Sequence, residues 1–372
     1  MALLAILAFS ILVYTYVGYP ILIGVLARVR PLRVAEDPAY LPKVTACIPV
    51  YNAASYLTAK VESLLALDYP ADKIEILLYS DGSDDDTNDV AAAIAARDPR
   101  VKLLISATRG GKPKGVNRMI EAATGEVLLM TDVRQPLVPG ALRALVARLA
   151  DPKVACVSGN LVLRGKAGAG AYWRYENWIR KQESRFRGMV GVTGPIYAIR
   201  KVDMRALPEG VILDDMWVPL RLRLAGRHIL FAEGAIAYDD AFGDKREYGR
   251  KVRTLAGNYQ LFALLPALLV PFKNPSWFET FSHKLLRLVC PWALVGLLAA
   301  SGVGAITRAE ASPIILYGLR PLLGGQMAFY LFALLGEWGG RIGSLCRTFV
   351  VLNSAAVVGL WRFVTGAQKV TW

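Results

Sequence analysis

Apolar runs bounded by turn residues alternate with amphipathic stretches through the middle of the chain. Runs that predict buried strands lie at 44–50, 74–79, 101–105 and 126–130. Patterns that predict helices lie between and after them, around 55–67, 87–97, 114–123 and 139–150. Strands and helices that alternate at this spacing favour a mostly parallel sheet with right-handed crossovers. We therefore predict an α/β domain over residues 43–240, with its ligand site at the carboxyl ends of the strands.

The beginning of the chain has a different pattern, because residues 2–27 contain no charged side chain. A helix of that length crosses a hydrocarbon core of about 30 Å at 1.5 Å per residue. Arg28, Arg30 and Arg33 follow it, so the positive-inside rule places the N-terminus outside and the rest of the domain in the cytoplasm. A cleaved signal peptide is the alternative, but the run lacks a basic n-region and is longer than a usual h-region. We predict a transmembrane anchor over residues 1–30.

Beyond residue 240 the chain is basic and then strongly apolar. Residues 241–287 combine a basic cluster with aromatic residues near helical spacing, which is typical of helices that lie in a membrane interface. The C-terminal region 288–372 contains uncharged or nearly uncharged runs at 288–307, 313–336 and 348–361. We expect the first two to span a membrane, although Arg320 interrupts the second. The last is short for a crossing and is equally compatible with a re-entrant or interfacial segment.

Composition agrees with this division. The chain has 372 residues, of which 54% are hydrophobic and 20% are charged, against about 45–50% and about 25% in average soluble domains. Its four cysteines are widely separated and it has only two histidines, which argues against a disulfide scaffold, a zinc site and histidine-based catalysis. The net charge of +14 suits nucleic acid, anionic lipids or a phosphorylated substrate. Much of the basic excess flanks apolar segments, so lipid head groups explain it more simply than nucleic acid does.

Polar residues that could contact a ligand follow three of the predicted strands. The first strand ends in a turn that contains Tyr51 and Asn52, and the second ends in an acidic loop that begins at Asp81. These acidic residues are also good turn and helix-capping residues, so the loop alone is a weak signal. Gly111 and Lys112 precede a helix, where glycine allows close backbone approach and the helix N-terminus favours anions. Asp132 follows the strand at 126–130 and places a single carboxylate at the same edge.

The order of these motifs resembles the inverting family 2 glycosyltransferases of GT-A fold. The matching segments are P-x-Y-N at 49–52, S-D-G-S-x-D-x-T at 80–87, G-G-K-x-x-x-x-N at 110–117 and T-D at 131–132. The likeness continues with a glycine segment at 191–200, a D-D pair at 214–215 and R-K-V-R-T at 250–254, the last in the place of Q-x-x-R-W. It covers residues 44–260, and the flanking apolar runs are similar to the membrane-embedded branch that includes cellulose and hyaluronan synthases.

The resemblance implies a role for each matching residue. It makes Asp215 the general base that deprotonates the acceptor hydroxyl, with Asp214 in support. It places Gly194 and Trp217 on the acceptor side. It assigns donor binding to Pro49, Tyr51, Asn52, Asp81, Gly111, Lys112, Asn117, Asp132, Arg250 and Arg253. Asp132 would also be the first carboxylate of a D-x-D motif and so a ligand of Mg²⁺ or Mn²⁺.

Two departures from the family pattern affect these expectations. Arg134 stands at the second D-x-D position, so a divalent cation would depend on Asp132 and the diphosphate oxygens, or Arg134 would partly replace its charge. The R-K-V-R-T segment lacks the glutamine and tryptophan of Q-x-x-R-W, which weakens the case for processive polymerisation.

The sequence therefore predicts a multi-pass membrane enzyme that transfers a sugar from a UDP- or GDP-sugar to a lipid-linked or membrane-proximal saccharide acceptor, without a nucleic-acid partner. A processive polysaccharide synthase that exports its product is the first alternative. A non-catalytic membrane scaffold with a degenerate transferase domain is the second.

Overall fold

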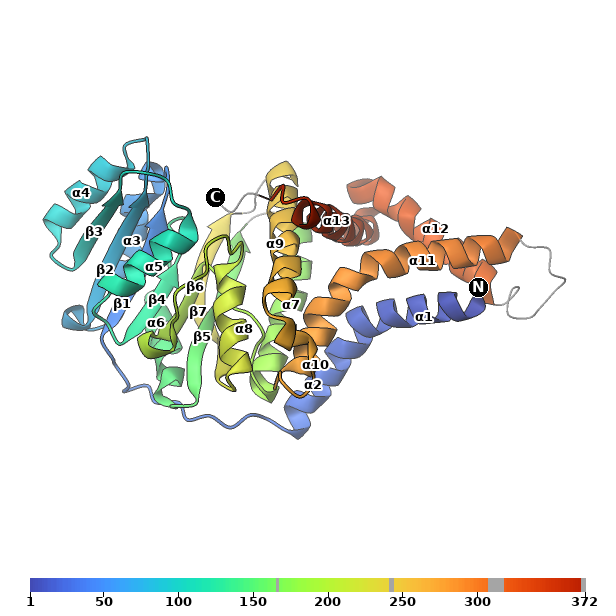
Figure 1. Cartoon of the computed structure of the whole chain (residues 1–372), viewed down its shortest axis with the longest axis horizontal. Coiled ribbons are helices and arrows are strands. Elements are labelled where there is room, and N and C mark those ends of the chain that lie inside the picture. Colours follow the sequence, from blue (N-terminus) through green and yellow to red (C-terminus); the bar gives the residue numbers. More distant parts are fainter. Residues whose placement is uncertain (165–166, 241–243, 307–317, 369–372) are drawn as a thin grey trace.

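A mixed sheet forms the centre of the predicted α/β domain. The computed structural model describes the chain apart from residues 165–166, 241–243, 307–317 and 369–372. Within the described residues the sheet has seven strands in the order β3-β2-β1-β4-β6-β5-β7 (Figure 1). The strands are β1 Val44–Val50, β2 Ile74–Asp81, β3 Val101–Ser106, β4 Val127–Thr131, β5 Val154–Arg164, β6 Ile196–Arg200 and β7 His228–Asp240. Among the described strands, only β6 runs antiparallel to both of its neighbours, which confirms the mostly parallel sheet.

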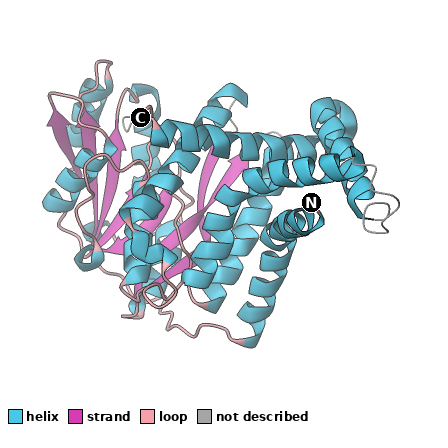
Figure 2. Cartoon of the chain, turned by 45° about the vertical axis from the view of Figure 1, so that its right-hand side comes forward, coloured by secondary structure: helices cyan, strands magenta, loops and turns pink. Residues whose placement is uncertain are grey.

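Helices cover both faces of this sheet (Figure 2). One apolar core joins the sheet to α3 Ala54–Leu65, α4 Thr87–Arg97 and α6 Ala141–Val146. The core on the other face contains side chains of α5 Lys112–Ala122 and α8 Asp214–Leu224. Successive β1 residues alternate between the two cores, because neighbouring side chains of a strand point to opposite faces. The predicted strands and helices of residues 43–150 are confirmed to within about two residues at most ends, with a 3-10 turn extending α6.

The strand register brings the predicted motifs to one edge of the sheet. Val50 at the end of β1 pairs with Ser80 near the end of β2, and Cys47 of β1 pairs with Met130 of β4. Because these strands are parallel, their carboxyl ends open on the same side. Asp81 and Asp132, which end or follow β2 and β4, therefore lie at one edge, as predicted.

Among the described residues, three long apolar helices lie outside the α/β domain and have the length and composition to cross a membrane. The first is continuous over Ala2–Val29 and includes α1 Ala2–Val13 and α2 Tyr19–Val29, joined by a π-helical turn at Tyr14–Gly18. The second covers Trp277–Ala305 and the third covers Arg320–Val364. In Figure 1 these helices extend from one side of the sheet domain, with α1 beside α11 Leu286–Ile306.

The second and third helices differ from the predicted segments. The aromatic, basic stretch from Trp277 belongs to the same helix as the uncharged run that follows it, since α10 Trp277–Glu279, a π-helical turn at Thr280–Leu285 and α11 are continuous. The short run at 348–361 lies within α13 Gly340–Val364, which is 25 residues long. A 3-10 turn at Gly336–Gly339 joins α13 to α12 Arg320–Leu335. Residues 313–317 of the predicted third span lie outside the described residues.

The chain returns to the α/β domain along α13, which packs against α9 Asp244–Leu264. A Cβ atom on Gly359 of α13 would lie 2.9 Å from the backbone nitrogen of Ala256, so glycine is required for the two helices to approach this closely. The helix α9 carries the basic segment that sequence analysis assigns to donor binding. The third long helix is thereby fixed directly behind that segment.

Candidate active site

A buried ammonium group lies between the carboxylates at the sheet edge. Lys112 Nζ is 3.2 Å from Asp132 Oδ1 and 3.3 Å from Asp214 Oδ2. Asp215 is next along the chain and contributes to the electrostatic field at the same ammonium. Only 14% of the Lys112 side chain is exposed, against 30% for Asp132 and 9% for Asp214. The predicted carboxylates of two distant segments therefore share one cation.

Local structure explains why these groups meet. Asp132 directly follows β4, and Lys112 is the first residue of α5. Leu213 is the N-cap residue of α8, so Asp214 and Asp215 stand in its first turn rather than at the cap position. Carboxylates in a first turn interact favourably with the helix dipole. Helix capping by this pair, the simplest structural explanation of it, therefore does not describe the geometry.

The shared charges shift the pKa values of the group. Burial alone would lower the pKa of Lys112, but Asp132, Asp214 and Asp215 together raise it above its ordinary value. Burial would raise the pKa of Asp132, and the ammonium of Lys112 holds it below its usual value instead. For Asp215, burial and then the neighbouring charge of Asp214 raise the pKa to about 6. The proton affinity of Asp215 is thus raised towards neutral pH.

The opposite wall of the site is formed around Asp81. Its two carboxylate oxygens accept hydrogen bonds from the backbone N–H groups of Gly110 and Gly111, each at 2.8 Å. The buried carboxylate therefore fixes the loop that leads into α5. Gly82 also requires glycine, because its φ is +65° and a Cβ atom would lie 2.6 Å from the backbone nitrogen of Arg109.

The first motif forms a second contact with this loop. The guanidinium carbon of Arg109 lies 3.8 Å from the centre of the Tyr51 ring, so the two side chains stack. Asn52 has a φ of 47°, and its side-chain amide pairs with Asp84 of the acidic loop. Pro49 is buried inside β1, opposite Tyr79 of β2. Tyr51 and Asn52 therefore lie at the site, whereas Pro49 supports it from within the sheet.

Three more of the predicted residues lie near the carboxylates or act on them electrostatically. A Cβ atom on Gly194 would lie 3.0 Å from Asp215 Oδ2, so the glycine segment packs directly against this carboxylate. Arg253 donates to the carbonyl of Ile212 at 3.3 Å and acts electrostatically on Asp215, while Arg250 acts on Asp132.

Asn117 and Trp217 are placed differently from one another. Both polar atoms of the Asn117 side chain bond the backbone of Leu207, at 2.9 and 2.7 Å, which makes this residue a tie between α5 and the 207 segment. Trp217 lies in α8 two residues after Asp215 and is buried, and its indole nitrogen has no hydrogen-bond partner among the described residues.

Lys60, a buried lysine beneath the site, is not among the residues predicted from the sequence. Its ammonium donates to Thr131 Oγ1 and to the carbonyl of Gln135, each at 2.6 Å. Burial lowers the pKa of Lys60 to about 7, against the opposing effect of Asp132. The signal was present in the sequence, because Lys60 interrupts the apolar face that Leu57 and Leu64 form on α3.

Arg134 is paired away from the carboxylate cluster. Its guanidinium bonds both oxygens of Asp239, at 2.6 and 2.7 Å, and Gln135 donates to the same carboxylate. The described residues contain no group of three or more His, Cys, Asp or Glu side chains that could hold a metal ion. Asp132 alone still fits Mg²⁺ or Mn²⁺ bound mainly by phosphate and water oxygens, since Mg²⁺ usually takes one or two carboxylates.

Comparison with known proteins agrees with the geometry. Residues 45–205 match the model of Glycosyl transferase family 2. Glycosyltransferase AglE of Haloferax volcanii is 27% identical over 266 residues, which cover 69% of this chain and 82% of AglE. Glycosyltransferase GlyG of Streptococcus pneumoniae is 29% identical over 117 residues, and the match spans 38% of that protein.

A solved structure shares the fold over nearly the whole chain. It is the mannosyltransferase PcManGT from Pyrobaculum calidifontis in complex with GDP-Man and Mn²⁺, with a TM-score of 0.76 and 24% identity over 97% of this chain and 99% of that one. The chain is therefore a glycosyltransferase with a family 2 domain and a GT-A fold.

Proposed function

We propose that this glycosyltransferase acts at a membrane and transfers a sugar, with inversion, from a nucleotide-sugar donor to a lipid-linked or membrane-proximal saccharide acceptor. The observation that carries the proposal is the position of Asp215. It adjoins the cation-rich edge formed by Lys112 and the basic α9 segment, and it contacts the glycine segment at Gly194. A base between a diphosphate-binding edge and an acceptor-facing loop is the arrangement that single displacement requires.

The proposed reaction is an in-line displacement at the anomeric carbon. Asp215 accepts the proton of the acceptor hydroxyl while the oxygen of that hydroxyl forms a bond to the anomeric carbon. The bond between the anomeric carbon and the diphosphate breaks at the same time, and its electron pair stays on the leaving oxygen. Lys112, Arg250 and Arg253 would stabilise the charge that develops there. Asp214 would hold Lys112 in place rather than accept the proton, because its oxygen already faces that ammonium.

The donor and the acceptor would occupy different parts of the edge. Tyr51, Asn52 and the loop held by Asp81 would bind the nucleotide, which we expect to be UDP or GDP. PcManGT is solved with GDP-Man, which agrees with a nucleotide-sugar donor of this kind. Trp217 and Gly194 would face the acceptor. The altered R-K-V-R-T segment favours a single transfer over the processive synthesis of the cellulose and hyaluronan synthase branch.

A panel of nucleotide sugars tests this assignment first. We expect one UDP- or GDP-sugar to stabilise the purified protein by about 2.7 kcal/mol at a hundredfold excess over its Kd, seen as a rise of a few degrees in Tm. The stabilising donor should then be hydrolysed or transferred, and gel analysis should show the addition of single sugars. A ladder of long products would support the processive synthase instead. If no donor in the panel stabilises the protein and none is turned over, the result would contradict the enzyme proposed here.

The role of Asp215 makes a second prediction. Asp215→Asn keeps the shape of the side chain but removes the base, so single-turnover transfer should fall by about two to four orders of magnitude while nucleotide affinity survives. Asp214→Asn is the matched control, and its transfer rate should fall less. In the unmodified enzyme the rate should decline below about pH 6, where Asp215 becomes protonated and can no longer accept a proton. Transfer by Asp215→Asn near the rate of the unmodified enzyme would remove Asp215 as the base.

A divalent cation, where bound, would be held by Asp132 with the diphosphate oxygens, and it would neutralise charge on the leaving group. Arg134→Asp adds a second carboxylate there, so we expect the variant to bind Mn²⁺ about tenfold more tightly in the presence of nucleoside diphosphate. Paramagnetic resonance of Mn²⁺ measures this without any turnover. Chelator should also lower the activity of Arg134→Asp more than that of the unmodified enzyme.

Arg134→Gln serves as the control in this comparison, because it removes the cation without adding a ligand. Equal Mn²⁺ affinity in Arg134→Asp and Arg134→Gln would show that position 134 does not face the ion.

We further propose that the three long apolar helices cross the membrane and that the transferase domain faces the cytoplasm. The basic residues after position 27 support this side, and the packing of α13 on α9 supports a C-terminus on the same side as the domain. Topology reporters fused after residue 40 and within 150–200 should both score cytoplasmic, and so should one fused after Val364. A periplasmic signal from the reporter after residue 40 or from the one within 150–200 would overturn the proposed orientation. A periplasmic signal from the reporter after Val364 would overturn the third crossing.

A further inference from the structure

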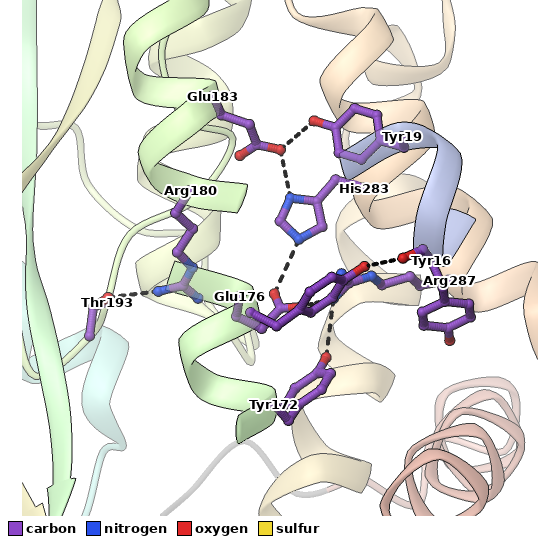
Figure 3. A network of polar contacts seen from close by, with 10 residues as sticks. Tyr16, Tyr19, Tyr172, Glu176, Arg180, Glu183, Thr193, His283 and Arg287 are labelled. Carbon is purple, nitrogen blue, oxygen red and sulfur yellow. Dashed lines mark hydrogen bonds and ion pairs between the residues drawn. The ribbon is translucent and has the colours of Figure 1, made fainter. Parts of the chain in front are cut away.

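A buried polar cluster fastens the long apolar helices to α7 Ala167–Phe186, away from the proposed site (Figure 3). His283 Nδ1 lies 2.6 Å from Glu183 Oε1, and His283 Nε2 lies 3.2 Å from Glu176 Oε2. Tyr19 donates to the same oxygen of Glu183 at 2.6 Å, and Arg287 donates to Glu176. Tyr19 belongs to the first long helix, while His283 and Arg287 belong to the second. One helix of the transferase domain thus contacts both.

The two glutamates of this cluster have shifted pKa values, although both are buried. Burial would raise the pKa of Glu183, yet His283 holds it below its usual value. Burial would likewise raise the pKa of Glu176, and Arg287 and His283 hold it well below. The cluster is therefore a set of paired buried charges, and such pairs tolerate little displacement.

Both long helices depart from α-helical geometry where they meet this cluster. His283 lies in the π-helical turn Thr280–Leu285, and the π-helical turn Tyr14–Gly18 ends directly before Tyr19. Such turns are uncommon and are found frequently at functional sites. The carbonyl of Tyr16, in the latter turn, accepts a hydrogen bond from Tyr175 of α7 at 2.8 Å. The departures thus coincide with the contacts to α7.

The same face of α7 reaches the proposed active site. Glu176, Arg180 and Glu183 are spaced four and three residues apart and so lie on one face of the helix. Arg180 points away from the two glutamates in Figure 3 and donates to Thr193 Oγ1 at 2.7 Å. Arg180 therefore joins the fastened helix to the loop Gly191–Pro195.

This loop determines the surroundings of Asp215. The backbone N–H of Thr193 donates to Ser158 Oγ at 2.9 Å, and that of Val192 donates to the carbonyl of Asp215 at 3.2 Å. Gly194 packs against the Asp215 carboxylate, as described above. A displacement of Thr193 would therefore move both the backbone and the side-chain surroundings of Asp215.

We propose that Arg180 is a positioning residue that holds the loop Gly191–Pro195 at Asp215, with the Glu176–His283–Glu183 cluster fixing α7 relative to the long helices. The catalytic part of this inference rests on the proposed function, because it takes Asp215 as the base. The physical link from His283 through α7 to Thr193 does not. The orientation of the long helices and the geometry of the acceptor side are thereby coupled.

Hydrogen exchange on the full chain tests the link without any substrate. Arg180→Met and Thr193→Val should each raise exchange in the 189–196 segment about tenfold, since each removes a charge-assisted hydrogen bond. Thr193→Ser keeps the hydroxyl and should exchange like the unmodified protein. Lys181→Met is the matched control on α7, because Lys181 pairs with Glu233 at the surface. His283→Gln should raise exchange in the same segment, whereas β1 and β2 should be unaffected in every variant.

A double-mutant cycle separates positioning from general loosening of α7. Arg180→Met combined with Thr193→Val should exchange no faster than either single variant, because both break one contact. Additive effects, or an unchanged 189–196 segment in Arg180→Met, would overturn the link. An equal rise of exchange in the 189–196 segment of Lys181→Met would also overturn the link.

Kinetics with GDP-mannose and UDP-N-acetylglucosamine as probes then test the catalytic part. Arg180→Met should lower kcat for hydrolysis of the accepted donor about tenfold with KM unchanged, and Thr193→Ser should retain kcat. A raised KM with unchanged kcat, or unchanged kinetics despite faster exchange, would overturn the positioning role. Absence of turnover in the unmodified protein would count against the proposed function, while the exchange results would still decide the link.

Discussion

The burial of the Lys112 ammonium among carboxylates is the interaction on which the edge of the sheet depends. Asp132 and Asp214 are 82 positions apart in the chain, yet one cation lies within 3.3 Å of both. Carboxylates brought this close destabilise one another unless a cation intervenes. The β4 end, the α5 start and the α8 start can therefore converge only with Lys112 between them. The buried ammonium of Lys60 supports the same edge from below, through Thr131.

Sequence reasoning was accurate where burial follows a simple period. The strands Val44–Val50 and Ile74–Asp81 are mostly apolar because both of their faces are covered, and such segments stand out without an alignment. The parallel arrangement then places Asp81 and Asp132 at one edge. Convergence of the motifs was thus predictable from strand ends alone.

Contacts between distant segments were not predictable in this way. Nothing in the local sequence indicates that Asp81 holds the backbone of Gly110 and Gly111, or that Asn117 bonds the backbone of Leu207. Arg134 could be recognised as an unusual residue, but its partner Asp239 lies more than a hundred positions away. These pairings depend on the relative placement of loops, which no short-range pattern encodes.

The polar contacts of the second long helix could not be predicted for a related reason. His283 and Arg287 made the stretch after Trp277 resemble an interfacial segment, because a charged residue is ordinarily solvated. In the fold both are buried and paired with glutamates of α7, so they do not interrupt the helix. Intramembrane or juxtamembrane charges commonly face protein partners in this way. The glutamate Glu176 that pairs with them lies in the amphipathic helix α7, more than a hundred residues earlier in the chain.

The arrangement of charges also limits how the proposed chemistry can operate. The site already holds Asp132, Asp214 and Asp215, and a nucleotide diphosphate would bring further negative charge. Added negative charge near Asp215 favours its protonated form and so opposes its role as a base. Lys112 cannot offset this alone, because it is shared with two carboxylates. The guanidinium groups of α9 therefore have a second proposed effect besides binding the leaving group: they keep Asp215 ionised while the donor is bound. Since α9 packs against α13, the third long helix bears directly on the position of those cations.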